Sequence, residues 1–472
     1  MFKRVAGMAV AVLVLVSGAA LAQDEYPKHA PETLPGVEPG MLTADYWIAL
    51  QNNPDEVVMT PDQIREFNRR VREKRVDLGQ KFGKANPLER EFVITEIKGP
   101  VMNPLMPLEL SATVPGDSLR VRLHSNVEWL YSRDFVDGRN ATWSDTMKKD
   151  LVAEMNIGSV PDMITRRYGI VVSHTLVRHY PTDVPGYSNA KWEMDMFQAT
   201  GLMVGNPVAV LHTSVNGDYL YIESPISRGW VKASDIAFGS LREISKLTGD
   251  DKFLMVTSHR EPVYTDRNFT VFDRYVYMSG TLPLARERKD AWEVKLPVRR
   301  PDGTVGTVKG YLRPDADVHV GYLPYTKRNV LTQIFKLIDQ PYGWADQDNK
   351  RDCSGTQRIV LRCFGIITGR HPSFILSASD HQTFIDRDWT TEEKTEKVAA
   401  LEPVITLAGN SGHIVMLLGK ARNGKLYFIH QAGWGYKDES GENLTVNRVS
   451  VNATDHSWYS INSPGVYTTF RP

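Results

Sequence analysis

The chain holds only two cysteines, Cys353 and Cys363, and the first has the surroundings of a nucleophile. It lies in the segment 352–355, Asp-Cys-Ser-Gly, and apolar residues then recur at helical spacing as far as Ile366. This pattern predicts a cysteine in the first turn of a helix. The positive end of a helix favours an anion, and it can lower a cysteine pKa from about 8.5 to between roughly 3.5 and 7.5. The segment therefore indicates a thiolate nucleophile, with a buried structural thiol as the alternative.

The second cysteine is predicted to be a small core residue. If Cys353 and Cys363 lie on one helix, their separation of ten positions corresponds to about 15 Å along its axis. A disulfide requires Cα atoms within about 7 Å of each other, so a bridge is excluded on this geometry.

Two of the 12 histidines flank a predicted hairpin and could supply the base for thiolate chemistry. His413 opens one strand, His430 ends the other, and Asn423-Gly424 marks the turn. A two-residue turn puts both histidines on one face but four residues out of register, about 13 Å along the strand. A bulge or a strong twist must close that gap if His430 is to orient His413. Ordinary polar residues at strand ends are the alternative.

The segments 352–355 and 412–413 (Gly-His), with the later His430, resemble the signature of the NlpC-type papain-like peptidases of bacterial cell walls. Tyr342, eleven residues before the cysteine, resembles the upstream tyrosine of that family. The resemblance implies that Cys353 is the nucleophile, His413 the general base and His430 the orienting third residue. Tyr342 and the backbone N–H of the cysteine would stabilise the oxyanion.

The same resemblance implies a substrate. Such enzymes cleave the γ-D-glutamyl bond to diaminopimelate in peptidoglycan stem peptides. Asp352, Ser354 and Trp344 would bind the substrate, the first two by holding the free amine of its L-Ala. The chain departs from the family pattern where Ala345-Asp346 replaces the usual Gly-Gly after the tryptophan, and where the loop to the cysteine is unusually charged. These departures concern the rim of the pocket more than the triad.

The rest of the chain must position these residues, and it predicts a multidomain protein. An α+β papain-like catalytic domain is expected after two small SH3-like β-barrels and a mixed, partly helical N-terminal domain. The barrels are indicated by short β-rich runs separated by turn signals, and they resemble the paired SH3-like domains of multidomain family members. The expected boundaries are a signal peptide at 1–22, an N-terminal accessory domain at 23–165, barrels at 166–245 and 252–320, and the catalytic domain at 325–472.

By resemblance, the first barrel closes one end of the cleft. That arrangement favours short peptides with a free N-terminal L-Ala over intact, glycan-linked wall. Glu193 and Asp195, in this barrel, are candidates for a second carboxylate facing the amine, and a solvated surface role is the alternative for either.

The first 22 residues have the form of a secretory signal. Lys3 and Arg4 precede the apolar run 10–16, and the segment 20–22, Ala-Leu-Ala, suits signal peptidase. The mature protein is expected to be exported, periplasmic or secreted, with no membrane anchor after signal removal.

Composition narrows the functional classes. The formal net charge is zero and 24% of the residues are charged, so a nucleic-acid partner is not expected. One candidate thiol with scattered histidines is a poor zinc set, so neither a metal nor another cofactor is expected. The predicted function is a cysteine endopeptidase acting on peptidoglycan stem peptides. The alternatives are a catalytically inert protein that binds these peptides, and an acyltransferase using the same triad.

Overall fold

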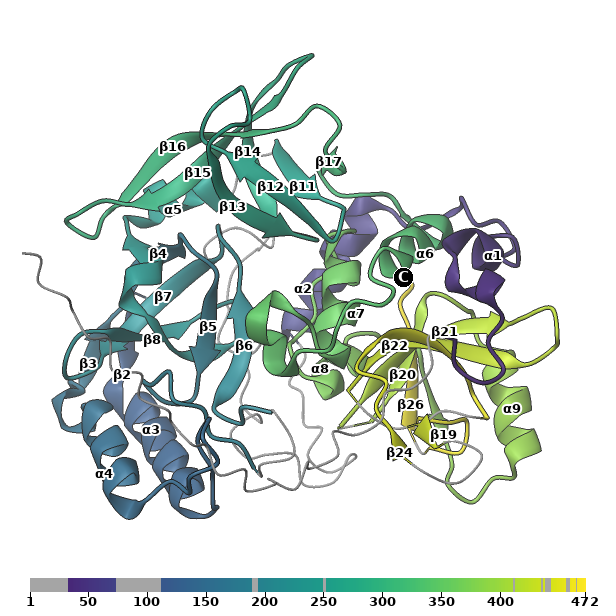
Figure 1. Cartoon of the computed structure of the whole chain (residues 1–472), viewed down its shortest axis with the longest axis horizontal. Coiled ribbons are helices and arrows are strands. Elements are labelled where there is room, and N and C mark those ends of the chain that lie inside the picture. Colours follow the sequence, from purple (N-terminus) through teal and green to yellow (C-terminus); the bar gives the residue numbers. More distant parts are fainter. Residues whose placement is uncertain are drawn as a thin grey trace, which may run out of the picture.

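The computed structural model describes residues 33–73, 112–188, 194–248, 252–410, 412–433, 436–437, 443–455, 459–463 and 465–472. Three large β-sheets organise these residues, and Figure 1 shows them at three corners of the molecule, with helices α7 and α8 between the first and the third. The predicted signal peptide lies outside the described residues. Within the described ranges, no helix is both long enough and apolar enough to cross a membrane.

The first sheet is antiparallel and surrounds an apolar cluster of its own that includes Val171, Val210 and Ile222. Its strand order is β10 (Ile236–Phe238), β4 (Arg167–Val171), β7 (Pro207–Thr213), β8 (Tyr219–Glu223), β9 (Arg228–Lys232), β5 (Thr175–Arg178) and β6 (Gln198–Leu202). The edge strand β6 is the one that faces the cysteine helix in Figure 1. This sheet occupies the place of the first predicted barrel.

The second sheet repeats this architecture around Leu254, Val263 and Val294. Its order is β13 (Phe272–Tyr277), β12 (Arg260–Tyr264), β16 (Val305–Leu312), β15 (Trp292–Arg299), β14 (Thr281–Glu287), β11 (Phe253–Val256) and β17 (Val318–Val320). Helix α5 (Leu241–Thr248) joins the two sheets. The second sheet occupies the place of the second predicted barrel.

The third sheet, with the helices before it, forms the α+β unit that was predicted at 325–472. Its order is β19 (Gln382–Ile385), β26 (Gly465–Thr469), β20 (Thr406–Gly409), β21 (Ile414–Lys420), β22 (Leu426–Ala432) and β25 (Arg448–Ala453). The helices are α6 (Lys327–Phe335), α7 (Cys353–Arg362), α8 (Pro372–Leu376) and α9 (Thr391–Ala399), with the 3₁₀ segment η6 (Trp344–Asn349) between α6 and α7. Helix α7 packs against β21 and β22, which brings the cysteine to the histidine strands.

The region predicted as one accessory domain divides between two cores. Leu34, Met41 and Trp47 join the cluster that also contains α6, α7 and the third sheet. Leu123 and Trp129 instead pack with residues of the first sheet. The early part contains η1 (Pro39–Leu42), α1 (Ala44–Ile48), β1 (Val57–Met59, paired with β18, Tyr325–Thr326) and α2 (Pro61–Glu73). The later part contains β2 (Thr113–Pro115, paired with β3, Met163–Thr165), α3 (Gly116–Tyr131), α4 (Asp145–Glu154) and η4 (Ile157–Ser159).

The remaining short elements are η5 (Ala233–Asp235) and the pair β23 (Tyr436–Lys437) and β24 (Asn443–Leu444). Both cysteines are free, and Cys363 is fully buried at the end of α7 beside Val360 and Phe364. The prediction that it is a small core residue is confirmed.

Candidate active site

Cys353 is the first residue of α7, as the sequence predicted. Asp352 caps the helix, because its Oδ1 accepts a hydrogen bond from the backbone N–H of Gly355 at 2.7 Å. Cys353 is 6% exposed, and the backbone N–H of Ile414 lies near enough to the thiol to lower its pKa. Because Ile414 follows His413 directly, the nucleophile candidate lies at the start of the strand that carries the base candidate.

The two histidines meet in the structure. His413 Nε2 lies 2.7 Å from His430 Nδ1, and both rings are buried. Their centroids are 4.9 Å apart and their planes nearly perpendicular. The contact between His413 and His430, which the proposed triad requires and which the sequence alone could not establish, is therefore present.

Two irregularities in the hairpin close the gap between the histidine positions. The turn holds three residues, 422–424, instead of the predicted two, because the backbone N–H of Ala421 bonds to the carbonyl of Lys425 at 2.9 Å. A β-bulge between Leu417 and Gly419 adds a further residue to the first strand. Each change moves the register by one residue, so together they preserve the side-chain face and halve the stagger.

The remaining stagger is two residues, as the ladder shows. Met416 pairs with Ile429, so Val415 lies opposite His430 when the ladder is continued by one residue. His413 is then the diagonal neighbour of His430 on the same face, a distance that aromatic side chains span. The three-residue turn and the bulge are thus the reason that a 2.7 Å contact forms.

The electrostatics of this region differ from the sequence prediction. Burial, followed by the charge of Asp352, raises the pKa of the Cys353 thiol to about 12, although the N–H of Ile414 and the charge of Arg370 lower it. Burial, followed by the charge of His430, holds the pKa of His413 well below its ordinary value. Burial likewise lowers the pKa of His430 to about 4. In the free protein, burial therefore favours a protonated thiol over the thiolate expected from the helix start.

Tyr342 reaches the same region from the loop before η6. Its backbone N–H bonds to the carbonyl of Asn447, and its ring lies against Gly433. Burial raises the pKa of its hydroxyl well above the ordinary value, followed by the negative charges that Asp352 and Cys353 carry when ionised. The hydroxyl is therefore a protonated donor near the thiol. Trp344 is half-buried, and its indole N–H has no hydrogen-bond partner among the described residues.

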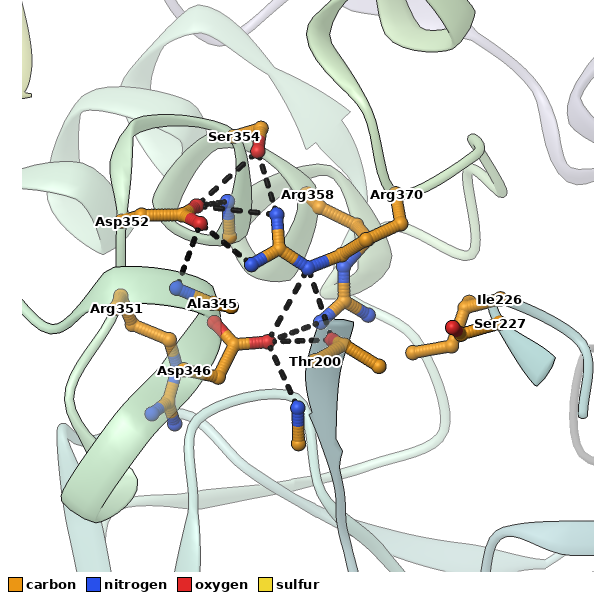
Figure 2. A network of polar contacts seen from close by, with 12 residues as sticks. Thr200, Ile226, Ser227, Ala345, Asp346, Arg351, Asp352, Ser354, Arg358 and Arg370 are labelled. Atoms are coloured by element: carbon orange, nitrogen blue, oxygen red, sulfur yellow. Dashed lines mark hydrogen bonds and ion pairs between the residues drawn. The ribbon is translucent and has the colours of Figure 1, made fainter. Parts of the chain in front are cut away.

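Asp352 is engaged by an arginine that sequence reasoning did not single out. Arg370 binds it with two parallel contacts, Nη2 to Oδ2 at 2.6 Å and Nη1 to Oδ1 at 3.1 Å, and donates to Ser354 Oγ at 2.6 Å (Figure 2). Asp352 also accepts from Ser354 Oγ and from the backbone N–H groups of Gly355 and Ala345. A carboxylate offers about four lone-pair sites, and here five donors already occupy them.

This ion pair continues to the first sheet through Asp346. The Oδ2 atom of Asp346 accepts from Thr200 Oγ1 at 2.8 Å and lies 3.4 Å from Arg370 Nε and 3.5 Å from Arg358 Nη2 (Figure 2). Arg370 Nε donates to the same threonine hydroxyl at 2.8 Å. The network therefore ties strand β6 of the first sheet to the cap of the cysteine helix.

The backbone conformation of η6 directs the Asp346 side chain toward Thr200 and Arg370. Ala345 and Asp346 have φ values of 49° and 65°, in the left-handed region that favours glycine. Gln198, on β6, donates to the carbonyl of Ala345 at 2.9 Å. These two residues replace the Gly-Gly of the family pattern, and the buried contacts of Asp346 and the carbonyl of Ala345 stabilise the turn.

Glu193 and Asp195 were the two candidates in the first barrel for a second carboxylate facing the substrate amine. Asp195 is buried rather than solvated, because its Oδ2 pairs with Arg178 at 2.6 Å and its Oδ1 accepts from the N–H groups of Gly186 and Phe197. Glu193 lies outside the described residues.

Comparisons with known proteins identify the fold. A family model described as an SH3 domain of the SH3b1 type matches residues 185–232, within the first sheet. An NlpC/P60 endopeptidase from Photobacterium damselae subsp. piscicida superposes with a TM-score of 0.68 at 17% identity, over 90% of this chain and 96% of that one. The chain has the fold of an NlpC/P60 endopeptidase. The resemblance predicted from segments 352–355 and 412–413 is thereby confirmed at the level of the fold.

An NlpC/P60 family protein from Bacillus cereus gives a TM-score of 0.46 at 16% identity, over 65% of this chain and 100% of that one. This weaker likeness adds nothing to the fold assignment. No curated protein sequence matches the chain. The fold assignment therefore rests on the superposition with the Photobacterium endopeptidase.

Proposed function

We propose that the chain is a cysteine endopeptidase of the NlpC/P60 family that cleaves the γ-D-glutamyl bond to diaminopimelate in peptidoglycan stem peptides. One observation carries the proposal: Cys353 lies at a helix start near the backbone N–H of Ile414, and the adjacent His413 places its Nε2 2.7 Å from His430 Nδ1. A nucleophile, a base and an orienting group are the parts that thiol acyl transfer requires.

The protons move as follows. His430 holds Nε2 of His413, which leaves Nδ1 of that ring to take the thiol proton. Because the free protein has a protonated thiol and a neutral imidazole, this transfer accompanies the attack of sulfur on the γ-glutamyl carbonyl. The oxyanion that forms is stabilised by the backbone N–H of Cys353 and by the hydroxyl of Tyr342.

Collapse of the tetrahedral intermediate breaks the C–N bond, and His413 returns the proton to the leaving amine of diaminopimelate. A thioester to Cys353 remains. Water then attacks the thioester, with His413 again as the base, and releases the γ-D-glutamyl carboxylate and the free thiol. Transfer of the acyl group to an amine would use the same intermediate, and this is the acyltransferase alternative.

The free-amine preference implied by the resemblance does not fit the contacts of Asp352. An ammonium that bound there would have to displace Arg370 from a buried, bidentate ion pair. We therefore propose that neither Asp352 nor Ser354 binds the substrate amine, and that the enzyme cleaves amine-blocked peptides as well as free ones.

The test is digestion of L-Ala-γ-D-Glu-diaminopimelate beside the same peptide acetylated on its amine, read by mass spectrometry. Rates within about threefold of each other support both the triad and the filled pocket. Cleavage of the free peptide alone keeps the triad and overturns the account of Asp352. Cleavage of neither, with a reduced thiol, favours the inert binding protein, and Cys353→Ala provides the blank.

Export completes the proposal, because its substrate lies outside the cytoplasm. The predicted signal at 1–22 would deliver the protein to the periplasm or the medium. Amino-terminal sequencing of the mature protein tests this, with Gln23 as the expected first residue.

A further inference from the structure

A pocket lies between the first sheet and the outer side of α7, away from the proposed catalytic residues. It is a narrow, partly open pocket with room for a few water-sized groups. The first sheet contributes apolar residues and Asn206, and α7 with the segment after it contributes the opposite wall. Neither Cys353 nor the two triad histidines line it. Figure 2 shows one wall, where Arg358 extends toward Asp346 with Ile226 beside it.

The pocket has a positively charged lining that contains no carboxylate. Arg358 and Arg362 both line it, and none of its nine lining residues is acidic. Among the described residues, Arg358 forms one ion pair, a long one of 3.5 Å to an Asp346 oxygen that Arg370 shares. Arg362 makes no ion pair among the described residues, and the groups that favour its charged form are Tyr322 and Cys363.

Two buried polar atoms at this pocket lack partners. Arg358 is 4% exposed, and its Nε has no hydrogen-bond partner among the described residues. Thr368 is 3% exposed, and its Oγ1 is likewise unpartnered within the described ranges. Buried donors without acceptors are costly, and an arginine donor more so than a neutral one. Burial lowers the pKa of Arg358 to about 10, although the charge of Asp346 opposes this shift, and burial also lowers the pKa of Arg362.

The other walls indicate what kind of anion fits. Leu202, Pro225, Ile226, Ile366 and Ile367 give the pocket an aliphatic lining. An inorganic phosphate would leave that lining without a partner, whereas a carboxylate on a short alkyl chain satisfies both the guanidinium groups and the apolar walls. We propose that this pocket binds a small aliphatic carboxylate, held by Arg358, Arg362 and Thr368, at the junction of the first sheet and the cysteine helix.

This site is independent of the proposed peptidase chemistry, so its test needs no turnover. Isothermal titration calorimetry of the full chain with acetate, propionate and butyrate, at constant ionic strength and pH 7.5, measures the binding directly. Each added methylene should strengthen binding about fourfold, since burying one CH₂ contributes about 0.8 kcal/mol. Butyramide, which keeps the chain and lacks the charge, should not bind.

Two variants locate the site. Thr368→Val preserves volume and Arg362→Met removes one charge, and each should weaken butyrate binding at least about tenfold. Arg313→Met, which changes an arginine stacked on aromatic rings of the second sheet, is the matched control and should bind as the wild type does. Absence of carboxylate binding overturns the proposal, as does binding that both pocket variants retain. Phosphate binding tighter than butyrate binding would overturn the assignment to an aliphatic carboxylate.

Discussion

Two neighbouring regions of the site are equally buried but have opposite electrostatics. The nucleophile–base region, formed by Cys353, His413 and His430, contains groups whose shifted pKa values keep them uncharged near neutral pH. The ion-pair network, centred on Asp352 and Arg370, contains full charges that satisfy one another. The comparison teaches that burial alone does not set reactivity. The neutral groups of the nucleophile–base region can exchange a proton, whereas the charges of the ion-pair network stabilise the cap of the cysteine helix.

The largest expected effect concerns the nucleophile. Cys353→Ala should lower kcat at least about 10⁴-fold with little loss of stability, because it removes a reacting atom and leaves the network intact. Kinetics on the tripeptide, with a urea denaturation curve, measure both quantities. Cys363→Ala, the matched control for the buried thiol of the core, should keep kcat within about twofold. Turnover by the first variant would sink the assignment of the nucleophile.

The network should respond in the opposite way. Arg370→Met leaves the Asp352 carboxylate buried without its cation, which should lower the free energy of unfolding by about 3–5 kcal/mol. Urea denaturation measures this. Adding Asp352→Asn, which keeps a capping side chain and removes the charge, should recover part of the loss.

Arg328→Met is the control for the network variant, because Arg328 forms an exposed ion pair with Asp55 and its loss should change the denaturation midpoint little. If Arg370→Met were as stable as this control, the pair with Asp352 would not hold the helix cap, and the contrast between the two regions would fail.

Tyr342 lies at the boundary between the regions and sharpens the comparison. Tyr342→Phe removes one proposed oxyanion donor, so kcat should fall roughly 100-fold while KM changes little. Tyr467→Phe removes a buried hydroxyl that has no partner among the described residues and should leave kcat unchanged. A loss confined to KM would reassign Tyr342 to substrate binding.

The smallest effect tests the neutrality of the thiol. In a Cys363→Ala background, alkylation of Cys353 by iodoacetamide should be slow at pH 7 and accelerate about tenfold per pH unit up to pH 9. The sign follows from the shift: burial raises the thiol pKa to about 12, so the reactive thiolate is scarce at neutral pH and grows as pH rises. A rate that levels off above pH 7.5 would restore the thiolate predicted from the helix start.

The two regions also differ in how far the sequence predicted them. The helix start at Cys353 and the strands carrying both histidines follow from local pattern. The contact between His413 and His430 depended on turn length and a bulge, which one residue more or less would change. Local patterns predict elements and faces well, whereas the register of this hairpin is decided by the length of its turn and by a bulge that those patterns do not reveal.

The ion-pair network could not be predicted from local sequence patterns. Thr200 and Arg370 lie 170 residues apart in the chain, and no spacing rule connects them. The sequence did contain one indication of the network. Ala345-Asp346 replaces the Gly-Gly of the family pattern and a charged loop follows, and both indicated an altered pocket rim. Burial of the thiol, which decides its pKa, depends on the same long-range packing and was missed for the same reason.

The central claim is that the triad attacks a γ-glutamyl carbonyl while Asp352 stays paired with Arg370. A crystal structure of Cys353→Ala bound to L-Ala-γ-D-Glu-diaminopimelate tests both halves at once. The account predicts the γ-glutamyl carbonyl carbon within about 3.5 Å of the position of the missing sulfur, and the Arg370–Asp352 pair intact. A substrate ammonium seated on Asp352 with Arg370 displaced, or a carbonyl remote from residue 353, would contradict it.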